Sequence, residues 1–276
     1  MIEVSWFLLP PLAMAILLVG IHAYLGLHVL RREVIFIDIS LSQVAVLGGA
    51  LSFLLTGEHS SVPQTLFSLG ACVLIAAFLA WLHLRERQVS QEVVIGVTYA
   101  SASGFLILLL DRLPHGAEHL KEALVGNILF VNWSQVLVTF LVYAFVATIH
   151  YIFREKFWSA SNREIHSFLW DFLFYLLFGI VITFSTQHAG VLVVFTILVV
   201  PASLGRRFFK GTKAQLTSAW TFGLAAILVS FLLSYRLDLP AGPTIVAVLS
   251  LAFFASLIGT VLRPGTPIDQ RQKGLS

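Results

Sequence analysis

The stretch FREKFWSASNREIHSFLWDFLFYLLFGIVITFSTQHAGVLVVFTILVVPASLGRR, residues 153–207, decides the fold of this chain. Its charged opening, residues 154–165, is too polar to lie in lipid, and it is amphipathic enough to lie against another surface. The apolar runs at 167–187 and 190–205 are long enough to cross a membrane. We therefore expect a short helix on the cytoplasmic surface, followed by a hairpin of two membrane helices that turns at Gln187-His-Ala-Gly190.

The composition of the whole chain extends this prediction to all 276 residues. Hydrophobic residues make up 58%, charged residues only 11%, and the mean hydropathy is +0.91. Soluble domains carry about 25% charged residues, so a soluble core is excluded. We predict a single all-α, polytopic membrane domain over residues 1–276. The expected spanning helices are 6–27, 34–55, 63–84, 92–110, 134–153, 167–187, 190–205, 214–235 and 242–262.

The two ends of the chain and its cysteine content add little more. The N-terminus lacks the basic region of a signal peptide, so we expect the first apolar run to be retained as a helix. Residues 264–276, rich in Pro and Gln, read as a solvated cytoplasmic tail. Cys72 is the single cysteine and lies within an apolar run, so no disulfide framework is expected.

Basic residues alternate strictly between the loops. With the N-terminus outside, all but three of the 17 Lys and Arg residues fall in inner loops, the exceptions being Arg112, Lys121 and Arg236. This bias predicts an N-outside, C-inside topology in the cell membrane. The net charge of +3 is thus an orientation signal and does not indicate nucleic-acid binding. The outer loops carry more acids than bases, which raises the local concentration of cations.

The outer segment between Asp111 and Trp133 carries two further patterns. Residues 124–131 are too short to span, and we expect a re-entrant half-helix there. The sequence His115-Gly-Ala-Glu-His119 matches the H-x-x-E-H pattern of one metalloprotease class. Because Pro114 and Gly116 interrupt a helix across the motif, a solvated loop or weak surface metal capture fits better than zinc catalysis.

Asp38 is the sharpest signal inside a predicted membrane helix. An acid in the middle of the bilayer costs about 2.5–3.5 kcal/mol on insertion scales and usually faces a polar pathway or a partner. Ser42 lies one turn further, on the same face. Two interpretations stay open: Asp38 lines a pathway, or it lies near the inner end, hydrated or paired with Arg31 or Arg32.

Small residues mark the helix–helix contacts that we expect. Gly96, Ala100 and Gly104 recur every four residues, a spacing that lets helix backbones approach closely, although the same face could instead line the substrate path. The pairs Gly48/Ser52 and Ala45/Gly49 give the second helix a similar close-contact face. The isolated histidines His22, His83 and His150 are expected to be packing residues. The chain has no G-x-x-x-x-G-K-[ST] motif, so any ATP must be hydrolysed by a separate protein.

Several segments together resemble the membrane subunit of metal-ion ABC importers, the permease family for manganese, zinc and iron. The segment 153–207 has the family's coupling helix, and residues 190–202 read GVLVVFTILVVPA, like its Gly-Val-Leu-Leu-Val…Pro-Ala run. Residues 92–99 and LVGNIL at 124–129 are similar to further family segments. Residues 34–48, VIFIDISLSQVAVLG, align with Phe-x-Gly-Asp-x-Leu-Ser-His-Ala. The resemblance covers nearly the whole chain.

The match on the second helix departs from the family motif at its two metal-contacting positions. The family's Asp falls on Ile39 and its His on Gln43, while Asp38 replaces the Gly. Isoleucine cannot bind a metal, and an amide oxygen is a harder, weaker ligand than imidazole. Asp38, Ser42 and Gln43 are therefore the candidate metal-contacting residues.

The resemblance implies a type II importer-like permease with no catalytic residue and no cofactor of its own. It implies a second permease copy, an ABC ATPase on the cytoplasmic side and an extracytoplasmic solute-binding protein, all in a lipid membrane. The helix within 154–166 would couple to the ATPase, and Pro201 would be the flex point of the hairpin behind it. The candidate coupling residues are Arg154, Lys156, Arg163 and Glu164.

Three other functions stay open at this point. A permease for metal chelates, such as siderophores or cobalamin, would share the coupling helix but usually has a longer chain. A secondary cation transporter would show charged pairs at mid-membrane in two repeated halves, and Asp38 has no clear counterpart. An intramembrane enzyme would require catalytic groups that converge at depth, for which only the motif at His115–His119 is available.

Overall fold

The computed structural model describes residues 2–56, 61–85, 89–112, 116–165 and 167–261, and these parts form helices joined by short turns. Within them, nine helices are long and apolar enough to cross a membrane, as predicted. The elements are α1 Ile2–Arg32, α2 Ile37–Thr56, α3 Ser61–Arg85, α4 Gln91–Leu110, α5 Gly116–Val125, the 3₁₀ turn η1 Ile128–Phe130, α6 Trp133–Ile152, α7 Arg154–Ser161, α8 Phe168–Ala189, α9 Val191–Phe208, α10 Thr212–Leu237 and α11 Ala241–Val261. The predicted tail 264–276 lies outside the described residues.

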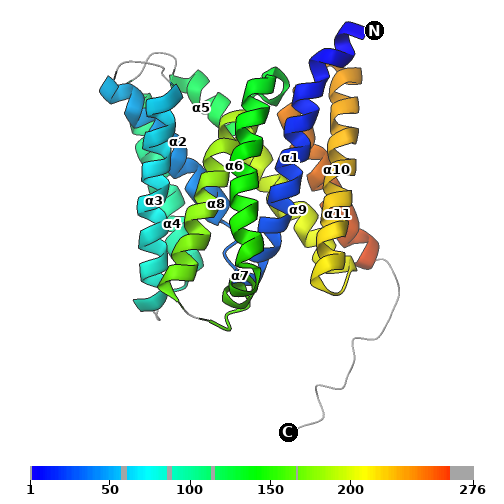
Figure 1. Ribbon diagram of the computed structural model, residues 1–276. Helices are drawn as coiled ribbons and strands as arrows, with labels where there is room; N and C mark the ends of the chain where they lie inside the picture. The colour runs from blue at the N-terminus through cyan, green and yellow to red at the C-terminus, as the bar shows by residue number, and fades with distance from the viewer. Residues whose placement is uncertain (1, 57–60, 86–88, 113–115, 166, 262–276) are drawn as a thin grey trace.

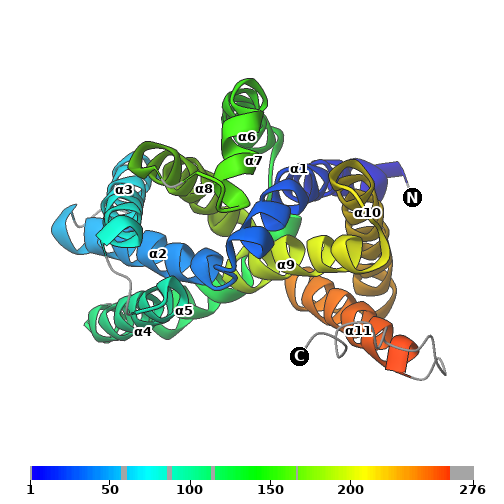
Figure 2. The same ribbon diagram turned by 90° about the horizontal axis from the view of Figure 1, so that it is seen from below.

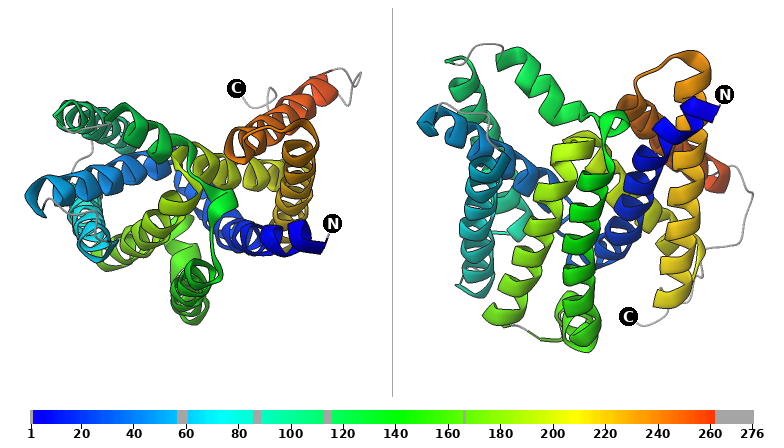
Figure 3. Two further views of the ribbon diagram at one scale, coloured as in Figure 1. Left: turned by 90° about the horizontal axis from the view of Figure 1, so that it is seen from above. Right: turned by 45° about the horizontal axis from the view of Figure 1, so that its top comes forward.

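The spanning helices pack as two groups that meet along the middle of the molecule (Figures 1 and 2). On one side α2 contacts α3 and α4, and α3 contacts α8; on the other, α9 contacts α1, α10 and α11. Figure 3 shows α6 at the edge of the bundle, and its contacts are mainly with α1 and α8. Most of the largest fully buried side chains come from α1, α2 and α8, so the core lies where the two groups join.

Close backbone contacts form within each group where the sequence supplies small residues. A side chain at Gly26 of α1 would collide with the backbone of Leu198 in α9. A side chain at Gly48 of α2 would lie 2.7 Å from the carbonyl oxygen of Phe67 in α3, which confirms the predicted close-contact face of α2. The predicted face of α4 is different, because Gly96 and Gly104 have open space where a side chain would begin. The expectation of packing at these two glycines was therefore wrong within this chain.

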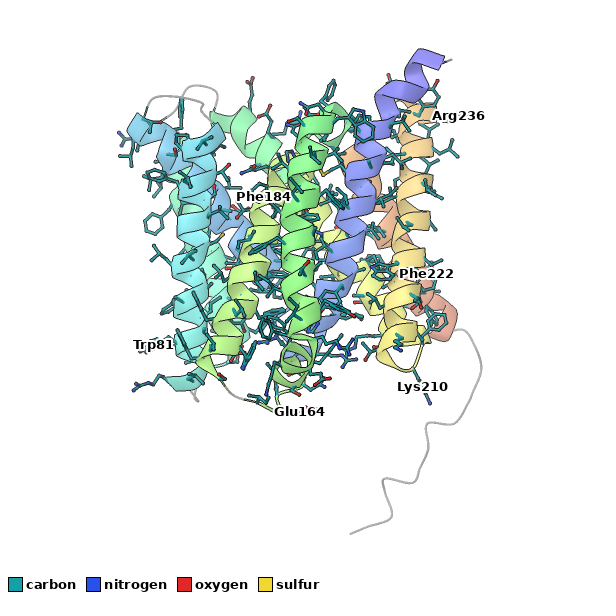
Figure 4. The ribbon with its side chains drawn as sticks, in the orientation of Figure 1. Trp81, Glu164, Phe184, Lys210, Phe222 and Arg236 are labelled. Carbon is teal, nitrogen blue, oxygen red and sulfur yellow. The ribbon has the colours of Figure 1, made fainter. Side chains whose placement is uncertain are left out.

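The two ends of the bundle differ in charge. In Figure 4, Glu164 and Lys210 lie at the α7 end, and Arg236 lies at the opposite end with the N-terminus. The other basic residues that the helix bounds place at or beside the α7 end are Arg31, Arg32, Arg85, Arg154, Lys156, Arg163, Arg206, Arg207 and Lys213. The α7 end is therefore the cytoplasmic one by the positive-inside rule.

The helix in the outer segment lies closer to the N-terminus than predicted. The half-helix expected at 124–131 is not there; instead α5 covers Gly116–Val125 and only the turn η1 follows. Gly126, with φ +67°, ends α5 by donating its N–H to Glu122 at 2.7 Å, and it lies against Ala189 and Gly190. Such left-handed glycines are common helix stops. Gly116 begins α5 rather than breaking a helix, and His115 lies outside the described residues.

The cytoplasmic helix is shorter than expected. α7 ends at Ser161, not at residue 166, because Arg163 adopts φ +62° and so leaves the helical conformation. Arg163 and Glu164 therefore lie in the turn that leads to α8. Residue 166 lies outside the described residues.

Candidate functional site

One polar stripe follows the length of α2. Asp38, Ser42, Ala45, Gly49 and Ser52 recur at steps of three or four residues, which puts them on one face of the helix. All five are buried in the bundle. A buried line of an acid, hydroxyls and small residues is unusual in a membrane helix, where polar groups mark pathways or helix contacts.

Asp38 is the most exceptional member of this stripe. Its side chain is 0% exposed, and among the described residues neither of its carboxylate oxygens has a hydrogen-bond partner. The interpretation that Asp38 pairs with Arg31 or Arg32 was wrong: Arg31 bonds to Asn162, and Arg32 bonds to Asp171. The burial also closes Asp38 off from bulk solvent. Because an unpaired buried carboxylate is costly, Asp38 requires a proton or a partner that the described residues do not supply.

The other two residues predicted beside Asp38 are also buried. Gln43 is 3% exposed, and the hydroxyl of Ser42 lacks a hydrogen-bond partner among the described residues. The structure therefore brings all three candidates to the inner half of α2. Within the same described part of the chain, no three His, Cys, Asp or Glu side chains gather closely enough to hold a metal ion. Asp38 thus has no preformed cage around it.

The outer half of the stripe opens onto a cavity of about 340 Å³. Gln64, Thr65, Gln135, Gln187 and His188 contribute polar groups to its wall, and Glu122 of α5 contributes an acid. Its remaining lining residues are Ala45, Val46, Gly49, Ala50, Phe53, Ser68, Leu106, Leu110, Ala123, Thr183 and Thr186. The cavity therefore lies between α2, α3, α4, α5, α6 and α8, toward the end of the bundle opposite α7.

A tight contact closes the floor of this cavity. The thiol of Cys72 donates to the carbonyl of Leu41 at 3.7 Å and lies 3.5 Å from the hydroxyl of Thr183. A side chain added at Gly179 would lie 3.2 Å from the Cβ of Cys72. Leu41, Cys72 and Gly179 each lie about one helical turn inward of a cavity-lining residue on the same helix. The floor separates the cavity from Asp38, which lies nearly one turn further inward than Leu41.

The predicted coupling residues surround α7 at the cytoplasmic end. Arg154, Lys156 and Glu164 are exposed, as a docking surface requires. Arg163 is also exposed, but its guanidinium pairs with Glu33 at 2.7 Å. Its charge therefore serves a contact within the chain, which separates it from Arg154 and Lys156.

The opposite side of α7 is packed into the bundle by aromatic rings. Trp158 stacks on His28 of α1 with ring centres 3.9 Å apart, and Phe157 stacks on His150 of α6 at 4.0 Å. His150 is buried and also bonds to the hydroxyl of Tyr24, which confirms its predicted packing role. His22 bonds to the carbonyl of Leu18 and to Ser185, which confirms its packing role.

Pro201 lies in the interior of α9, as predicted. A proline there removes one helical hydrogen bond and leaves a carbonyl one turn earlier without its partner. Pro201 is buried, and its ring would lie 3.4 Å from a side chain built at Gly223 of α10. The same added side chain at Gly223 would also lie close to Val19 of α1. The flex point assigned to Pro201 is thus surrounded by α1 and α10 and remains a prediction.

Sequence reasoning missed one pair of charges. Arg32 and Asp171 form an ion pair at 2.6 Å with side chains only 5% and 2% exposed. Asp171 stands in the apolar run Trp170-Asp-Phe, so an acid among aromatic residues was the available signal. Its partner could not be read from the sequence, because 139 positions separate the two residues.

The pattern that defines the ABC 3 transport family matches residues 5–260 of this chain. The chain is 24% identical to the high-affinity zinc uptake system membrane protein ZnuB of Haemophilus influenzae, over 91% of this chain and 96% of that protein. It is also 24% identical to the chelated iron transport system membrane protein YfeD of Yersinia pestis, over 80% and 77%. Among solved structures, PsaBC from Streptococcus pneumoniae in complex with Fab has a chain with the same fold, with a TM-score of 0.73, 22% identity and 91% of each chain covered.

Proposed function

The chain belongs to the ABC 3 transport family, and from this premise we propose that it is the permease subunit of an ATP-driven importer for divalent metal ions. It is a multi-pass membrane protein of a transport system and not itself an enzyme. The observation that carries the proposal is Asp38, a fully buried acid whose carboxylate lacks a partner within the described chain. A passing cation would supply the missing partner, since intramembrane acids mark ion pathways.

The polar stripe of α2 supports a route from the outer cavity to Asp38. Carboxylate, hydroxyl and amide oxygens are hard ligands that suit ions such as manganese and iron, and zinc also accepts them. The named functions of ZnuB and YfeD agree with zinc and iron as cargo. We therefore propose zinc, manganese or iron as the cargo class, with Asp38, Ser42 and Gln43 as the contacts.

The outer cavity is large enough for a hydrated ion. Six waters at about 30 Å³ each would occupy roughly 200 Å³, which fits within the cavity of about 340 Å³. Permeation of a metal chelate is the second candidate, and the relative named for chelated iron is what favours it.

The coupling proposal places the ATPase against α7. The exposed charges of Arg154, Lys156 and Glu164 would bind it from one side, while Phe157 and Trp158 hold α7 to the bundle from the other. A second copy of the permease would complete the pathway, and an extracytoplasmic binding protein would deliver the cargo. ATP-driven closure of the ATPases would then push α7 and the hairpin α8–α9 behind it.

The test is to purify the permease with its ATPase, reconstitute the complex in lipid vesicles and measure the accumulated metals by elemental analysis. We expect ATP-dependent accumulation of zinc, manganese or iron. Uptake driven by a proton gradient without any ATPase would contradict the proposal and favour a secondary transporter. Uptake of iron only as its chelate would instead support the second candidate.

Reversing the charges of Arg154 and Lys156 tests the docking surface separately. We expect the double variant R154E/K156E to lose co-purification of the ATPase, because both side chains are exposed and like charges would then face a surface built for cations. Membrane insertion and thermal stability should be unchanged. The control R236Q changes a charge at the opposite end of the bundle, and normal co-purification of R154E/K156E would refute the docking assignment.

A further inference from the structure

The end of α7 is bonded to the turn between α1 and α2. Five residues make this connection, which we call the clamp: Arg32 at the end of α1, Glu33 in that turn, Ser161 at the end of α7, Arg163 in the turn after α7, and Asp171 in α8. The turn itself covers residues 33–36, directly before α2 begins at Ile37. The clamp thus connects the proposed ATPase docking helix to the helix that carries Asp38.

The buried half of the clamp centres on Ser161. The hydroxyl oxygen of Ser161 accepts a hydrogen bond from Arg32 Nε at 3.1 Å, and it hydrogen-bonds with His28 Nδ1 at 2.8 Å. Arg32 donates from the same guanidinium to Asp171 of α8 at 2.6 Å. Its guanidinium also lies over the ring of Phe174, 4.1 Å from the ring centre. One arginine therefore holds α1, α7 and α8 in a single register.

A buried ion pair of this kind is not explained by stability. Removing two charges from water is so costly that apolar replacements of similar volume are often equally stable or more stable. What the pair adds is directional: a guanidinium with several donors fixes the relative position of the groups that it bonds. A joint that has to transmit a displacement requires that fixed geometry.

The exposed half of the clamp joins two residues in a strained backbone conformation. Glu33 has φ +57° and Arg163 has φ +62°, and neither is a glycine. A left-handed conformation costs about 1–2 kcal/mol for such residues. Their side chains nevertheless pair at 2.7 Å, and Arg163 also donates to the carbonyl of Arg32 at 3.1 Å. Strain at both ends of one contact suggests that the contact, rather than the local sequence, dictates the two turns.

We propose that the clamp passes a displacement of α7 to the turn before α2, and so moves Asp38 and the polar stripe during the transport cycle. This inference rests on the proposed function, because it requires an ATPase that pushes α7. The force then reaches the pathway through the α1–α2 turn as well as through the hairpin α8–α9. Asp38 lies only five positions after Glu33, and the second residue of α2 cannot stay in place when the turn that precedes it moves.

The turn before α2 is also bonded on its other side, so a shift at one end of the turn has to rotate α2. The carboxylate of Glu92, in the first turn of α4, accepts a hydrogen bond from the backbone N–H of Phe36 at 3.2 Å. Residues 33–36 are therefore bonded to the turn after α7 at one end, through Glu33 and Arg163, and to α4 at the other. A shift of α7 changes the angle at which α2 enters the bundle, with α4 as the support.

The experiment compares Glu33→Gln, Arg163→Gln and the exchanged pair E33R/R163E in the reconstituted complex with its ATPase. The quantity measured is the amount of metal transported per ATP hydrolysed, with ATPase binding and thermal stability measured on the same preparations. We expect both single variants to lower this ratio about two- to five-fold, the range that an exposed ion pair can supply. The exchanged pair should recover most of the loss, and the control R236Q should leave the ratio unchanged.

Each alternative outcome is distinct. If Arg163 contacts the ATPase directly, R163Q will weaken ATPase binding, E33Q will have no effect and the exchange will not recover the ratio, which overturns the clamp. If E33Q unfolds the protein, Ser161→Ala provides the second variant, and an unchanged ratio there also overturns it. If the wild-type complex accumulates no metal with ATP, the proposed function has failed rather than the clamp.

Discussion

Two buried acids near the cytoplasmic end of this protein have opposite surroundings. Asp171 of α8 is 2% exposed and pairs with Arg32 at 2.6 Å. Asp38 of α2 is 0% exposed, and its carboxylate has no hydrogen-bond partner in the described part of the chain. The two side chains have the same chemistry and nearly the same burial, so only the partner distinguishes them.

The difference separates the structural role of Asp171 from the transport role that we propose for Asp38. A buried acid with a basic partner is compensated within the fold, and losing the partner is what destabilises the protein. A buried acid without a basic partner already carries the free-energy cost of burial in the folded protein. Replacing this acid should therefore stabilise the fold and weaken the binding of any ligand at that position. The protein therefore buries two acids equally but gives only one of them a basic partner among the described residues, and substitutions can distinguish the two.

The largest effect should come from removing the partner of Asp171. The variant Arg32→Met leaves that carboxylate buried without its arginine, and we expect a loss of about 3–5 kcal/mol in stability. The measurement is thermal unfolding of the purified protein in detergent. The matched variant R32M/D171L replaces both charges by apolar groups and should unfold near the wild-type temperature. Equal damage in the single and double variants would show that the pair does not compensate its own burial.

The next largest effect should appear in transport rather than stability. The variant Asp38→Asn removes a charge that has no partner within the described residues, so its thermal stability should equal or exceed that of the wild type. Metal uptake should fall about ten- to hundred-fold, as expected when a charged contact is lost. Asp171→Asn should do the reverse and lose stability first. Unchanged uptake by Asp38→Asn would remove Asp38 from the pathway.

Smaller losses of uptake should follow from the neutral neighbours of Asp38. Ser42→Ala and Gln43→Ala remove contacts without charge, for which about two- to ten-fold is expected. Elemental analysis of loaded vesicles gives the ratio of metals as well as the amount. A change in that ratio for Gln43→Ala would sharpen its assignment as a ligand, since ligand type selects the metal. A loss larger than that of Asp38→Asn would reverse the assigned order of importance.

The smallest effect should come from a third acid that lies between the two extremes. Glu92 is half-buried at the start of α4, and its carboxylate accepts the N–H of Phe36 at 3.2 Å. Glu92→Gln keeps the acceptor and loses only a favourable charge at a helix N-terminus, worth about 0.3–1 kcal/mol. Glu92→Ala removes the acceptor too and should lower the unfolding temperature more. Equal shifts would mean that the hydrogen bond to Phe36 contributes nothing.

Much of the fold could be predicted from the sequence because each membrane helix is stabilised by hydrogen bonds between residues close in the chain. Every backbone hydrogen bond of such a helix forms within about four residues, so an apolar run of sufficient length predicts it without knowledge of its neighbours. The nine predicted helices were therefore confirmed. The errors fell where the local signal was weak, in the outer segment around α5 and at the end of α7, where left-handed residues rather than composition end the helices.

The candidate site was predicted less completely. Asp38, Ser42 and Gln43 could be selected because a polar residue in an apolar run is recognisable from the sequence alone. That Asp38 lacks a partner, and that Arg32 belongs to Asp171, could not be read in this way. A partner 139 positions away is chosen by helix packing, and sequence spacing carries no record of it.

The sequence by itself thus determined the number of spanning helices, their order and the bias of basic residues that orients them. These follow from hydrophobicity and charge counted along the chain. Only the tertiary structure decided which of two chemically identical acids is compensated, that the turn after α7 is bonded to the turn before α2, and that a cavity lies over the polar stripe. The reason is that pairing free energy depends on distances between helices, which are set by how all of them pack at once.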